Sequence, residues 1–209
     1  MKIKKKNYLI GIAGNIGVGK TTLTKILSDR LNWKPFYESV IDNPFLDDFY
    51  DDMKRWSFNL QIYFLSYRFR SLREIYQSGY HAIQDRTIYE DVEIFARSLY
   101  EQGYISERDY RTYRELFNNM IFFLPESDII IYLKASVKTL LNRIGLRGRD
   151  FEKTIAPDYL EYLNLAYERW IKETKEKNNV IIINTDEVDF QRETDKFEEL
   201  VSTIRETCP

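Results

Sequence analysis

The sequence has almost no cysteine or histidine, and these two shortages exclude several kinds of site. Cys208 is the one cysteine and His81 the one histidine among 209 residues. A disulfide framework and a cysteine-based zinc site both need more than one cysteine, so both are excluded. Ser-His-Asp and Cys-His catalysis and multi-histidine metal sites are disfavoured by the single histidine. Any catalysis by this chain would therefore depend on carboxylates, lysine, arginine and a bound cation.

The chain also lacks a strong charge of either sign. Its 31 lysine and arginine residues nearly balance its 33 aspartate and glutamate residues, which leaves a net charge of -2. A protein that binds duplex nucleic acid usually carries a basic excess to neutralise phosphates, so a nucleic-acid polymer is not the expected partner. Free nucleotides remain possible ligands.

Long apolar runs are missing as well. Lys2 and the lysines at 4–6, followed by the apolar run at 8–13, resemble the start of a signal peptide, but a glycine-rich loop follows where an A-x-A-like cleavage site is needed. No later stretch approaches the ~18 apolar residues that a membrane-spanning helix requires. We therefore expect a cytoplasmic protein with no membrane partner.

The residues that are present indicate a packed α/β protein. Hydrophobic residues make up 44% and charged residues 31% of the chain, and its length suits one domain over 1–209. Short apolar runs alternate with long amphipathic segments, and Ser106, Ser136 and Pro157 are placed as helix starts. This alternation predicts a doubly wound parallel sheet of five strands flanked by helices, with ligands beyond the carboxyl ends of the strands. The predicted strands are 9–13, 33–37, 82–84, 129–133 and 180–183.

A phosphate-binding loop follows the first predicted strand. The segment matches G-x-x-x-x-G-K-[ST] and runs into a helical pattern, which is the context that this motif requires. Glycines let backbone N–H groups surround an anion, the lysine reaches the terminal phosphates, and the Thr21 hydroxyl can bind Mg²⁺. The residues predicted to bind the nucleotide are Gly14, Asn15, Ile16, Gly17, Val18, Gly19, Lys20, Thr21 and Thr22.

Three arginines follow the fourth predicted strand, and they allow two interpretations. Arg143, Arg147 and Arg149 lie around Gly145 and Gly148. A basic surface loop is the simpler interpretation, because exposed arginines are common. Beside a phosphate-binding loop we favour a lid, because arginines that close over transferring phosphates stabilise the transition state and the two glycines would allow movement.

Two carboxylates follow predicted strands at the same end of the sheet. Asp85 comes directly after the third strand and Glu38 after the second. Asp85 can hold Mg²⁺ directly or through water, although a structural salt bridge is an equally simple role for it. We expect separate roles, with one carboxylate at the metal and the other at the proton of an acceptor.

Taken together, these motifs resemble the deoxynucleoside kinases of the deoxycytidine, deoxyguanosine and deoxyadenosine kinase group. The resemblance extends over nearly the whole chain in the right order, and it implies a P-loop kinase fold, ATP and Mg²⁺ as cofactors, and a homodimer. Feedback inhibition by a deoxynucleoside triphosphate is often found in this group. The segments that carry the resemblance are 14–21, Glu38, 56–61, 85–91, 147–149 and 189–190.

The resemblance implies roles for the residues near the transferring phosphate. Glu38 resembles the general base for the 5′-hydroxyl, and Arg86 resembles the arginine that contacts the 5′-oxygen. Asp85 resembles the acid on the Mg²⁺ side, although many members have glutamate there and serine where this chain has Thr87. Both departures are conservative and change the reach of the side chain by about one methylene.

The resemblance also implies a sugar and base site. Tyr50 and Glu152 resemble the pair that binds the 3′-hydroxyl, and Gln61 resembles the amide that reads the base edge. Ordinary core packing remains an alternative role for Tyr50 and Phe95, and a buried ion pair remains an alternative for Arg68 with Asp91. By the same resemblance, Arg68, Asp91 and Phe95 lie beside the base, while Asp189 and Phe190 lie around the donor adenine.

Two other functions share parts of this pattern. A nucleoside monophosphate kinase has a similar loop and lid, but Glu38 would repel an acceptor phosphate. A GTP-dependent switch protein would show Asp-x-x-Gly and a guanine-reading Asn/Thr-Lys-x-Asp, and neither motif is present. For the acceptor we favour deoxyadenosine, with deoxycytidine and deoxyguanosine as alternatives. Thymidine is disfavoured because Arg68 and Asp91 leave little apolar room for its methyl group.

Overall fold

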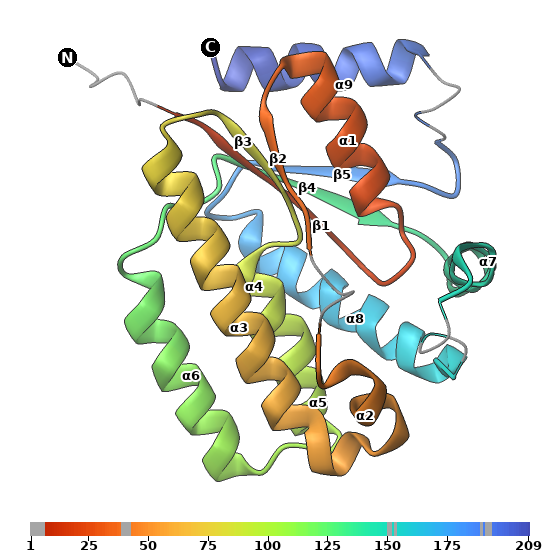
Figure 1. The fold of residues 1–209 in the computed structure, drawn as a ribbon. Helices are drawn as coiled ribbons and strands as arrows, with labels where there is room; N and C mark the ends of the chain where they lie inside the picture. Colours follow the sequence, from red (N-terminus) through yellow and green to blue (C-terminus); the bar gives the residue numbers. More distant parts are fainter. Residues whose placement is uncertain (1–6, 39–42, 150–151, 153, 189, 191–193) are drawn as a thin grey trace.

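The computed structural model describes residues 7–38, 43–149, 152, 154–188, 190 and 194–209. Within these residues, five parallel strands form one sheet in the order β2-β3-β1-β4-β5 (Figure 1). The α/β prediction and all five predicted strand positions are therefore confirmed. The strands are β1 (Leu9–Gly14), β2 (Lys34–Phe36), β3 (Ala82–Asp85), β4 (Ile129–Lys134) and β5 (Val180–Asn184).

Strand β2 is shorter than the predicted 33–37. It lies at the edge of the sheet and pairs with β3 alone, in the register Lys34 with Ala82 to Phe36 with Gln84. Pro35 has no N–H to donate, which suits an edge position. Trp33 stacks on the His81 ring at a centroid distance of 4.9 Å, so it packs outside the strand.

The helices begin where the sequence signals predict. Ser106 and Ser136 cap the helices that follow them, accepting hydrogen bonds from the N–H groups of Asp109 and Thr139, and Pro157 is the first residue of its helix. The longer helices are α1 (Lys20–Leu31), α3 (Met53–Ser78), α6 (Glu107–Ile121), α7 (Val137–Arg147), α8 (Pro157–Thr174) and α9 (Thr194–Thr207). A short helix, α2 (Leu46–Asp51), precedes α3.

One helix in the middle of the chain has an unusual centre. The elements α4 (Ile88–Glu90), η1 (Asp91–Ala96) and α5 (Arg97–Glu101) follow one another without a break, and η1 is a π-helix. Such segments are rare and frequently occur at functional sites. This one begins six residues after β3 ends, and it contains two of the predicted substrate residues, Asp91 and Phe95.

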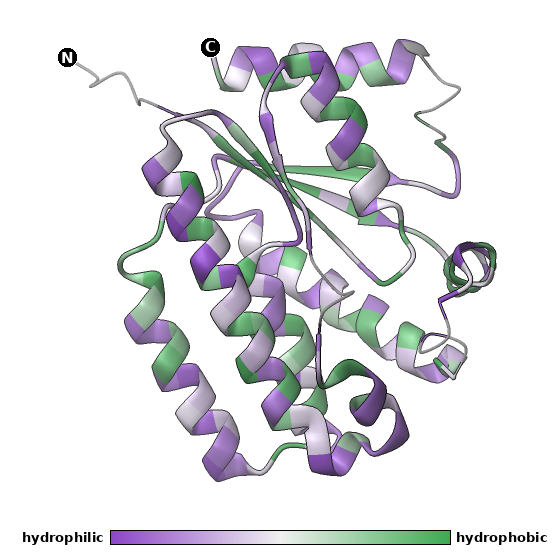
Figure 2. Cartoon of the chain, viewed as in Figure 1, coloured by the Kyte–Doolittle hydropathy of each residue, from purple (hydrophilic) through white to green (hydrophobic). Residues whose placement is uncertain are grey.

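Helices cover both faces of the sheet (Figure 1). Helices α1 and α9 lie on one face, while α3, α4 and α8 lie on the other, with α6 outside α3. The strands are therefore apolar on both sides, as Figure 2 shows for the centre of the sheet. Ile10, Ile12 and Ile131 are fully buried against Leu27 of α1 and Leu163 of α8. No helix in the described part of the chain is long and apolar enough to cross a membrane.

Candidate functional site

The predicted site residues come together at the carboxyl ends of the strands. A cavity of about 680 Å³ lies there, between the phosphate-binding loop, the end of β3, α3 and α7. Every predicted site residue within the described part of the chain lines this cavity, with the exception of Gly14, Asn15 and Arg68. Asp189 is outside the described residues. Most residues of the cavity wall were therefore among the predicted site residues. Gly14, Asn15 and Arg68 lie behind the wall and do not line the cavity.

The phosphate-binding loop has the backbone that its glycines allow. Gly14 has φ +147°, and a Cβ there would lie 2.5 Å from the carbonyl oxygen of Leu133, so another residue would clash. Gly19 has φ +106° and caps the N-terminus of α1. Lys20 is the first residue of α1, and its Nζ donates to the carbonyl oxygens of Gly14 (2.8 Å) and Asn15 (3.0 Å). Burial, with Arg86 nearby, lowers the pKa of Lys20 to about 8.

Asn15 holds the loop against α8 instead of facing the cavity. Its side-chain nitrogen donates to the carbonyl oxygen of Leu160 (2.9 Å) and to the amide oxygen of Asn164 (2.8 Å). Its own amide oxygen accepts a hydrogen bond from the N–H of Ile16 at 2.7 Å. The Asn15 side chain therefore fixes the loop from behind, which is a different role from the direct nucleotide contact that the motif predicts.

Thr21 and Asp85 form a pair that suits Mg²⁺. The Thr21 hydroxyl donates to Asp85 Oδ2 at 2.5 Å, and the other oxygen, Oδ1, is buried without a hydrogen-bond partner. Burial, with Glu38 nearby, raises the pKa of Asp85, while Lys20 opposes this shift. An unsatisfied buried carboxylate oxygen beside a hydroxyl fits a hard cation, which prefers oxygen ligands.

The protein groups around Thr21 and Asp85 do not form a complete metal cage. Among the described residues, no cluster of three or more histidine, cysteine, aspartate or glutamate side chains could hold a metal ion. Mg²⁺ is usually held by one or two protein ligands together with phosphate oxygens and water. Thr21 and Asp85 are the residues that would supply the protein ligands.

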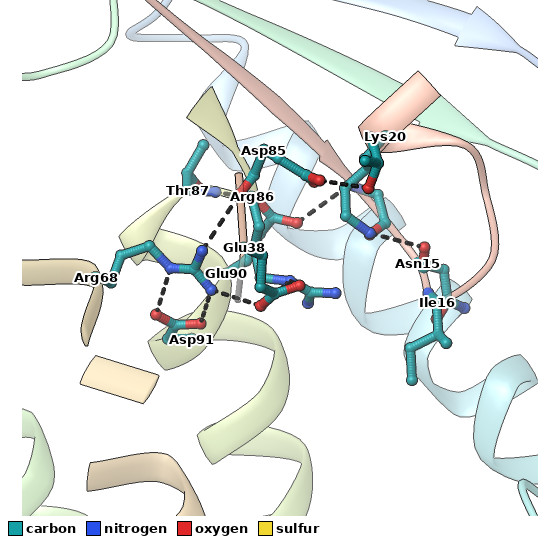
Figure 3. A network of polar contacts seen from close by, with 12 residues as sticks. Asn15, Ile16, Lys20, Glu38, Arg68, Asp85, Arg86, Thr87, Glu90 and Asp91 are labelled. Carbon is teal, nitrogen blue, oxygen red and sulfur yellow. Dashed lines mark hydrogen bonds and ion pairs between the residues drawn. The ribbon is translucent and has the colours of Figure 1, made fainter. Parts of the chain in front are cut away.

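Glu38 lies between two buried guanidinium groups (Figure 3). Its Oε1 accepts from Arg68 Nη2 at 2.8 Å, and its Oε2 accepts from Arg86 Nε at 3.1 Å. Burial alone would raise the pKa of Glu38, but Arg86 and Arg68 lower it to about 2. Glu38 is therefore ionised at neutral pH, and both of its oxygens have a fixed orientation.

Arg86 is held in an unusual backbone conformation. Its φ is +70°, in the left-handed region that non-glycine residues rarely adopt, and its N–H donates to the carbonyl oxygen of Ile12 at 2.9 Å. Its guanidinium lies over the Phe95 ring, 4.3 Å from the centroid. A strained backbone at a cavity wall is typical of functional residues.

The structure shows Arg68 as part of a buried ion pair and not as part of the cavity wall. Arg68 is 1% exposed, and its Nε and Nη2 donate to the two oxygens of Asp91 at 3.1 and 3.2 Å. Its Nη1 also donates to the carbonyl oxygen of Asp85 at 3.3 Å. This is the buried ion pair that the sequence left open as an alternative role for Arg68 and Asp91. Arg68 contacts the cavity-lining residues Glu38 and Asp91, and its place beside the base stays a prediction.

Gln61 and Tyr50 provide polar groups at the far side of the cavity from the loop. Gln61 is 2% exposed, and its amide oxygen is buried without a hydrogen-bond partner. Such an oxygen is available to accept a hydrogen bond from a ligand. Burial, together with Tyr159 and Glu152, raises the pKa of the Tyr50 hydroxyl. The proximity of Tyr50 and Glu152 agrees with their predicted pairing at a sugar hydroxyl.

The three arginines after β4 all line the cavity, but they have different partners. Arg147 donates to Glu152 with Nε (2.9 Å) and Nη2 (2.5 Å), and Arg149 Nη1 lies 3.5 Å from the same carboxylate. Arg143 instead donates to the carbonyl oxygens of Val18 and Thr185, at 2.9 and 2.8 Å. It joins the phosphate-binding loop to the segment after β5.

The two glycines that were predicted to allow lid movement have different places in the structure. Gly145 lies inside α7, which continues through it to Arg147. Gly148 ends the helix, with φ +68°. Arg143 and Arg147 therefore lie one turn apart on the same helix.

The residues of the site that sequence reasoning missed include Tyr159, Glu90 and Tyr167. Tyr159 of α8 lines the cavity, and Glu90 and Tyr167 contact the phosphate-binding loop from behind. The spacing of Thr87 and Glu90 matches the S/T-x-x-E capping pattern, so a helix start could have been predicted there. The two tyrosines have no local signal, because they belong to a regular amphipathic helix in a chain with 16 tyrosines.

Comparison with known proteins places the chain in a family. The model of the deoxynucleoside kinase family matches residues 10–209. The chain is 46% identical over 168 residues to the deoxyadenosine/deoxycytidine kinase of Bacillus subtilis, covering 79% of this chain and 77% of that protein. It is 44% identical over 178 residues to the deoxyadenosine kinase of Dictyostelium discoideum, covering 85% and 72% of the two chains.

Solved structures agree with this assignment. The deoxyadenosine kinase from M. mycoides with bound dATP superimposes with a TM-score of 0.83 and 32% identity, covering 94% of this chain and 100% of that chain. The same enzyme with bound dCTP gives a TM-score of 0.84, also at 32% identity, with the same coverage. The family match, the identities and the fold thus agree, and this protein belongs to the deoxynucleoside kinase family, whose members are ATP-dependent phosphotransferases.

Proposed function

We propose that the protein transfers the γ-phosphate of ATP to the 5′-hydroxyl of a deoxynucleoside, with deoxyadenosine as the preferred acceptor and deoxycytidine next. The observation that carries this proposal is Glu38, held by Arg68 and Arg86 in a cavity whose other end is the phosphate-binding loop. A carboxylate at this position can accept a hydrogen bond from a neutral hydroxyl. Relatives that use deoxyadenosine support the choice of acceptor.

Glu38 acts mainly by orienting the acceptor hydroxyl. A carboxylate whose pKa is about 2 is a weak base at neutral pH. Phosphoryl transfer passes through a loose transition state in which positioning and charge stabilisation matter most. Glu38 therefore aligns the 5′-hydroxyl early and receives its proton late, while the neighbouring Arg86 stabilises charge on the transferring group.

The donor phosphates would bind along the loop from Ile16 to Thr22, with Lys20 directed at the terminal phosphates. Thr21 and Asp85 would hold Mg²⁺, which neutralises charge on those phosphates when bound. The donor adenine would lie near Phe190, which lines the same cavity. As lid arginines, Arg147 and Arg149 would release their contacts with Glu152 and bind phosphate oxygens of the donor. Arg143 would hold the phosphate-binding loop in place through its contact with Val18.

The acceptor would bind between α3 and η1. Tyr50 and Glu152 would bind the 3′-hydroxyl, Phe95 would pack on the base, and the amide of Gln61 would pair with the base edge. Asp91 lies on this side of the cavity and accepts hydrogen bonds, so it favours bases with an exocyclic amine. Adenine and cytosine both have such an amine, whereas thymine lacks it.

The family resemblance supports further features of the whole protein. We infer that residues 1–209 form one kinase domain, that the protein is cytoplasmic and homodimeric, and that a deoxynucleoside triphosphate inhibits it by feedback. Related structures with dATP and dCTP show that enzymes of this kind bind such molecules. Sedimentation of the purified protein, with and without dATP, tests the dimer, and dATP titration of the activity tests the inhibition.

An assay with labelled ATP tests the proposed reaction. The four natural deoxynucleosides and their monophosphates are each incubated with enzyme, Mg²⁺ and γ-labelled ATP. We expect label in deoxynucleoside monophosphates, with the highest kcat/KM for deoxyadenosine. Label transferred only to the monophosphates would identify a nucleoside monophosphate kinase instead. If deoxycytidine ranked first, only the choice of acceptor would change.

A further inference from the structure

Glu90 is a buried carboxylate that contacts both halves of the site. Its exposed fraction is 0%. Its Oε2 accepts from the N–H and the hydroxyl of Thr87, at 2.7 and 3.0 Å. Its Oε1 accepts from the N–H of Gly14 at 3.1 Å and lies 2.7 Å from the Tyr167 hydroxyl. A single side chain therefore joins the segment after β3 to the start of the phosphate-binding loop.

A helix cap does not account for this arrangement. In a capping box, the glutamate side chain satisfies the N–H of the N-cap residue, and Glu90 does this for Thr87 with Oε2. The second oxygen of a capping glutamate is not needed by the helix and ordinarily faces water. In Glu90 this second oxygen is buried and binds Gly14, which is 76 residues away in the sequence.

On the acceptor side, Glu90 fixes the residue after Arg86. The backbone of Arg86 has φ +70°, a conformation that persists only where neighbouring contacts hold it. Ile12 accepts the Arg86 N–H on one side, and Glu90 accepts the Thr87 N–H on the other. These two contacts set the direction in which the Arg86 side chain leaves the backbone, toward Glu38 (Figure 3). The guanidinium also lies over the Phe95 ring.

On the donor side, Glu90 and Tyr167 fix the peptide groups on both sides of Gly14. Glu90 binds the N–H of Gly14, and the Tyr167 hydroxyl lies 2.8 Å from its carbonyl oxygen. The same carbonyl oxygen accepts a hydrogen bond from Lys20 Nζ. Tyr167 is itself fully buried and stacks on Tyr132 of β4 at a centroid distance of 5.6 Å.

We propose that Glu90, with Tyr167, is a positioning residue that fixes Arg86 of the acceptor side relative to Gly14 and Lys20 of the donor side. This proposal rests on the proposed kinase function. Neither residue lines the cavity, so neither touches a substrate. Glu90 and Tyr167 would instead fix the distance between the Arg86 guanidinium, which contacts the transferring phosphate, and the loop that binds the donor nucleotide. Small errors in such a distance reduce kcat, on the order of 10²-fold for about 1 Å, without weakening nucleoside binding.

The test uses the isosteric variant Glu90→Gln. The glutamine amide has one oxygen, so it can accept a hydrogen bond from the backbone N–H of Gly14 or from that of Thr87, but not from both. In either orientation its NH₂ group faces the other N–H, and one bridging contact is lost. We expect kcat for deoxyadenosine to fall on the order of 10- to 100-fold, with the nucleoside Kd unchanged within about 2-fold. Titration calorimetry gives the Kd and the fraction of folded protein, to which kcat is normalised.

Two further variants separate positioning from folding. Tyr167→Phe removes one hydroxyl, and we expect a smaller loss of kcat in the same direction. Glu93→Gln is the matched control in the same helical segment, because Glu93 is partly exposed and pairs with Arg114 and Arg97. Its kcat should equal that of the wild type. If Glu90→Gln does not fold, Tyr167→Phe decides the question, and a wild-type kcat in that variant refutes the proposal.

A double variant shows whether Glu90 acts through Arg86. If it does, the losses of kcat in Glu90→Gln and Arg86→Lys will not multiply when the two are combined. Losses that multiply, or a Glu90→Gln variant with normal kcat and only a lower melting temperature, would refute the proposal while leaving the kinase function intact. A wild-type protein that phosphorylates no deoxynucleoside would refute the proposed function, and the role of Glu90 with it.

Discussion

Replacement of Glu38 by glutamine tests the centre of the site most directly. The variant keeps the shape of the side chain and one carbonyl oxygen, but it removes the negative charge between Arg68 and Arg86. Arg68 retains its contacts with Asp91, so its position should change little. Arg86 loses a charged partner, and the acceptor hydroxyl loses the oxygen that receives its proton. We expect kcat to fall by at least ~10²-fold, with nearly unchanged nucleoside binding.

The pKa of Glu38 determines how the same substitution affects stability. This pKa is lowered from 4.5 to about 2, which corresponds to roughly 3 kcal/mol of stabilisation of the folded state. Because the pKa is depressed, the contribution is fully present above pH 4.5 and is lost as the pH falls toward 2. The difference in melting temperature between wild type and Glu38→Gln should therefore be largest near pH 7 and smaller at pH 3.5.

Three measurements check this reasoning: kcat with deoxyadenosine, nucleoside Kd by calorimetry, and thermal melts at several pH values. Glu74→Gln is the control, because Glu74 forms an exposed ion pair with Lys34 at 3.0 Å, and such pairs contribute little. Wild-type turnover in Glu38→Gln would remove Glu38 from the reaction. A melting difference that does not depend on pH would contradict the ion-pair origin of its low pKa.

The remaining predictions concern other parts of the same site. Lys20→Ala and Arg86→Ala should lower kcat more severely than Glu38→Gln, since phosphate positioning carries most of the catalysis; normal activity in Lys20→Ala would overturn the kinase assignment. Arg147→Ala and Arg149→Ala should each lower kcat with little change in nucleoside affinity, and lysine at either position should restore only part of the loss. Unaltered kinetics in the double alanine variant would return both arginines to the surface-loop interpretation. Among the four deoxynucleosides, thymidine should have the lowest kcat/KM, and its ranking first would contradict the role given to Asp91.

The fold could be predicted well because its signals are local. Short apolar runs that are buried on both faces identify the parallel strands, and the helix starts at Ser106 and Ser136 need only a few neighbouring residues. The exception is β2, where the apolar run at 33–37 is longer than the strand. The strand is short because it pairs with one neighbour only and because Pro35 has no N–H to donate. The pairing depends on the position of β2 in the sheet, which local patterns do not give.

The site could be predicted as a set of residues but not as a set of contacts. The ion pair of Arg68 with Asp91 was one of the roles left open by the sequence, but nothing in the sequence says that Arg68 also binds Glu38, 30 residues away. Arg143 was grouped with Arg147 and Arg149 because all three are close in sequence. In the structure Arg143 instead donates to Val18 and Thr185, whereas Arg147 binds Glu152. Contacts across the sheet end depend on tertiary packing, which local patterns do not report.

The charges at the acceptor end of the cavity favour a hydroxyl over a phosphate as the acceptor. Glu38 and Asp91 both line this end, and the two guanidiniums that contact Glu38 are already engaged by carboxylates. The phosphate of a nucleoside monophosphate carries about two negative charges, which these two carboxylates would repel. A hydroxyl instead needs an oxygen that accepts its hydrogen bond, and Glu38 supplies one. The same pairing of charges offsets the cost of placing the Glu38 carboxylate in the cavity wall. The ion pairs hold Glu38 ionised and in place, so a nucleoside can bind to a site that is already organised.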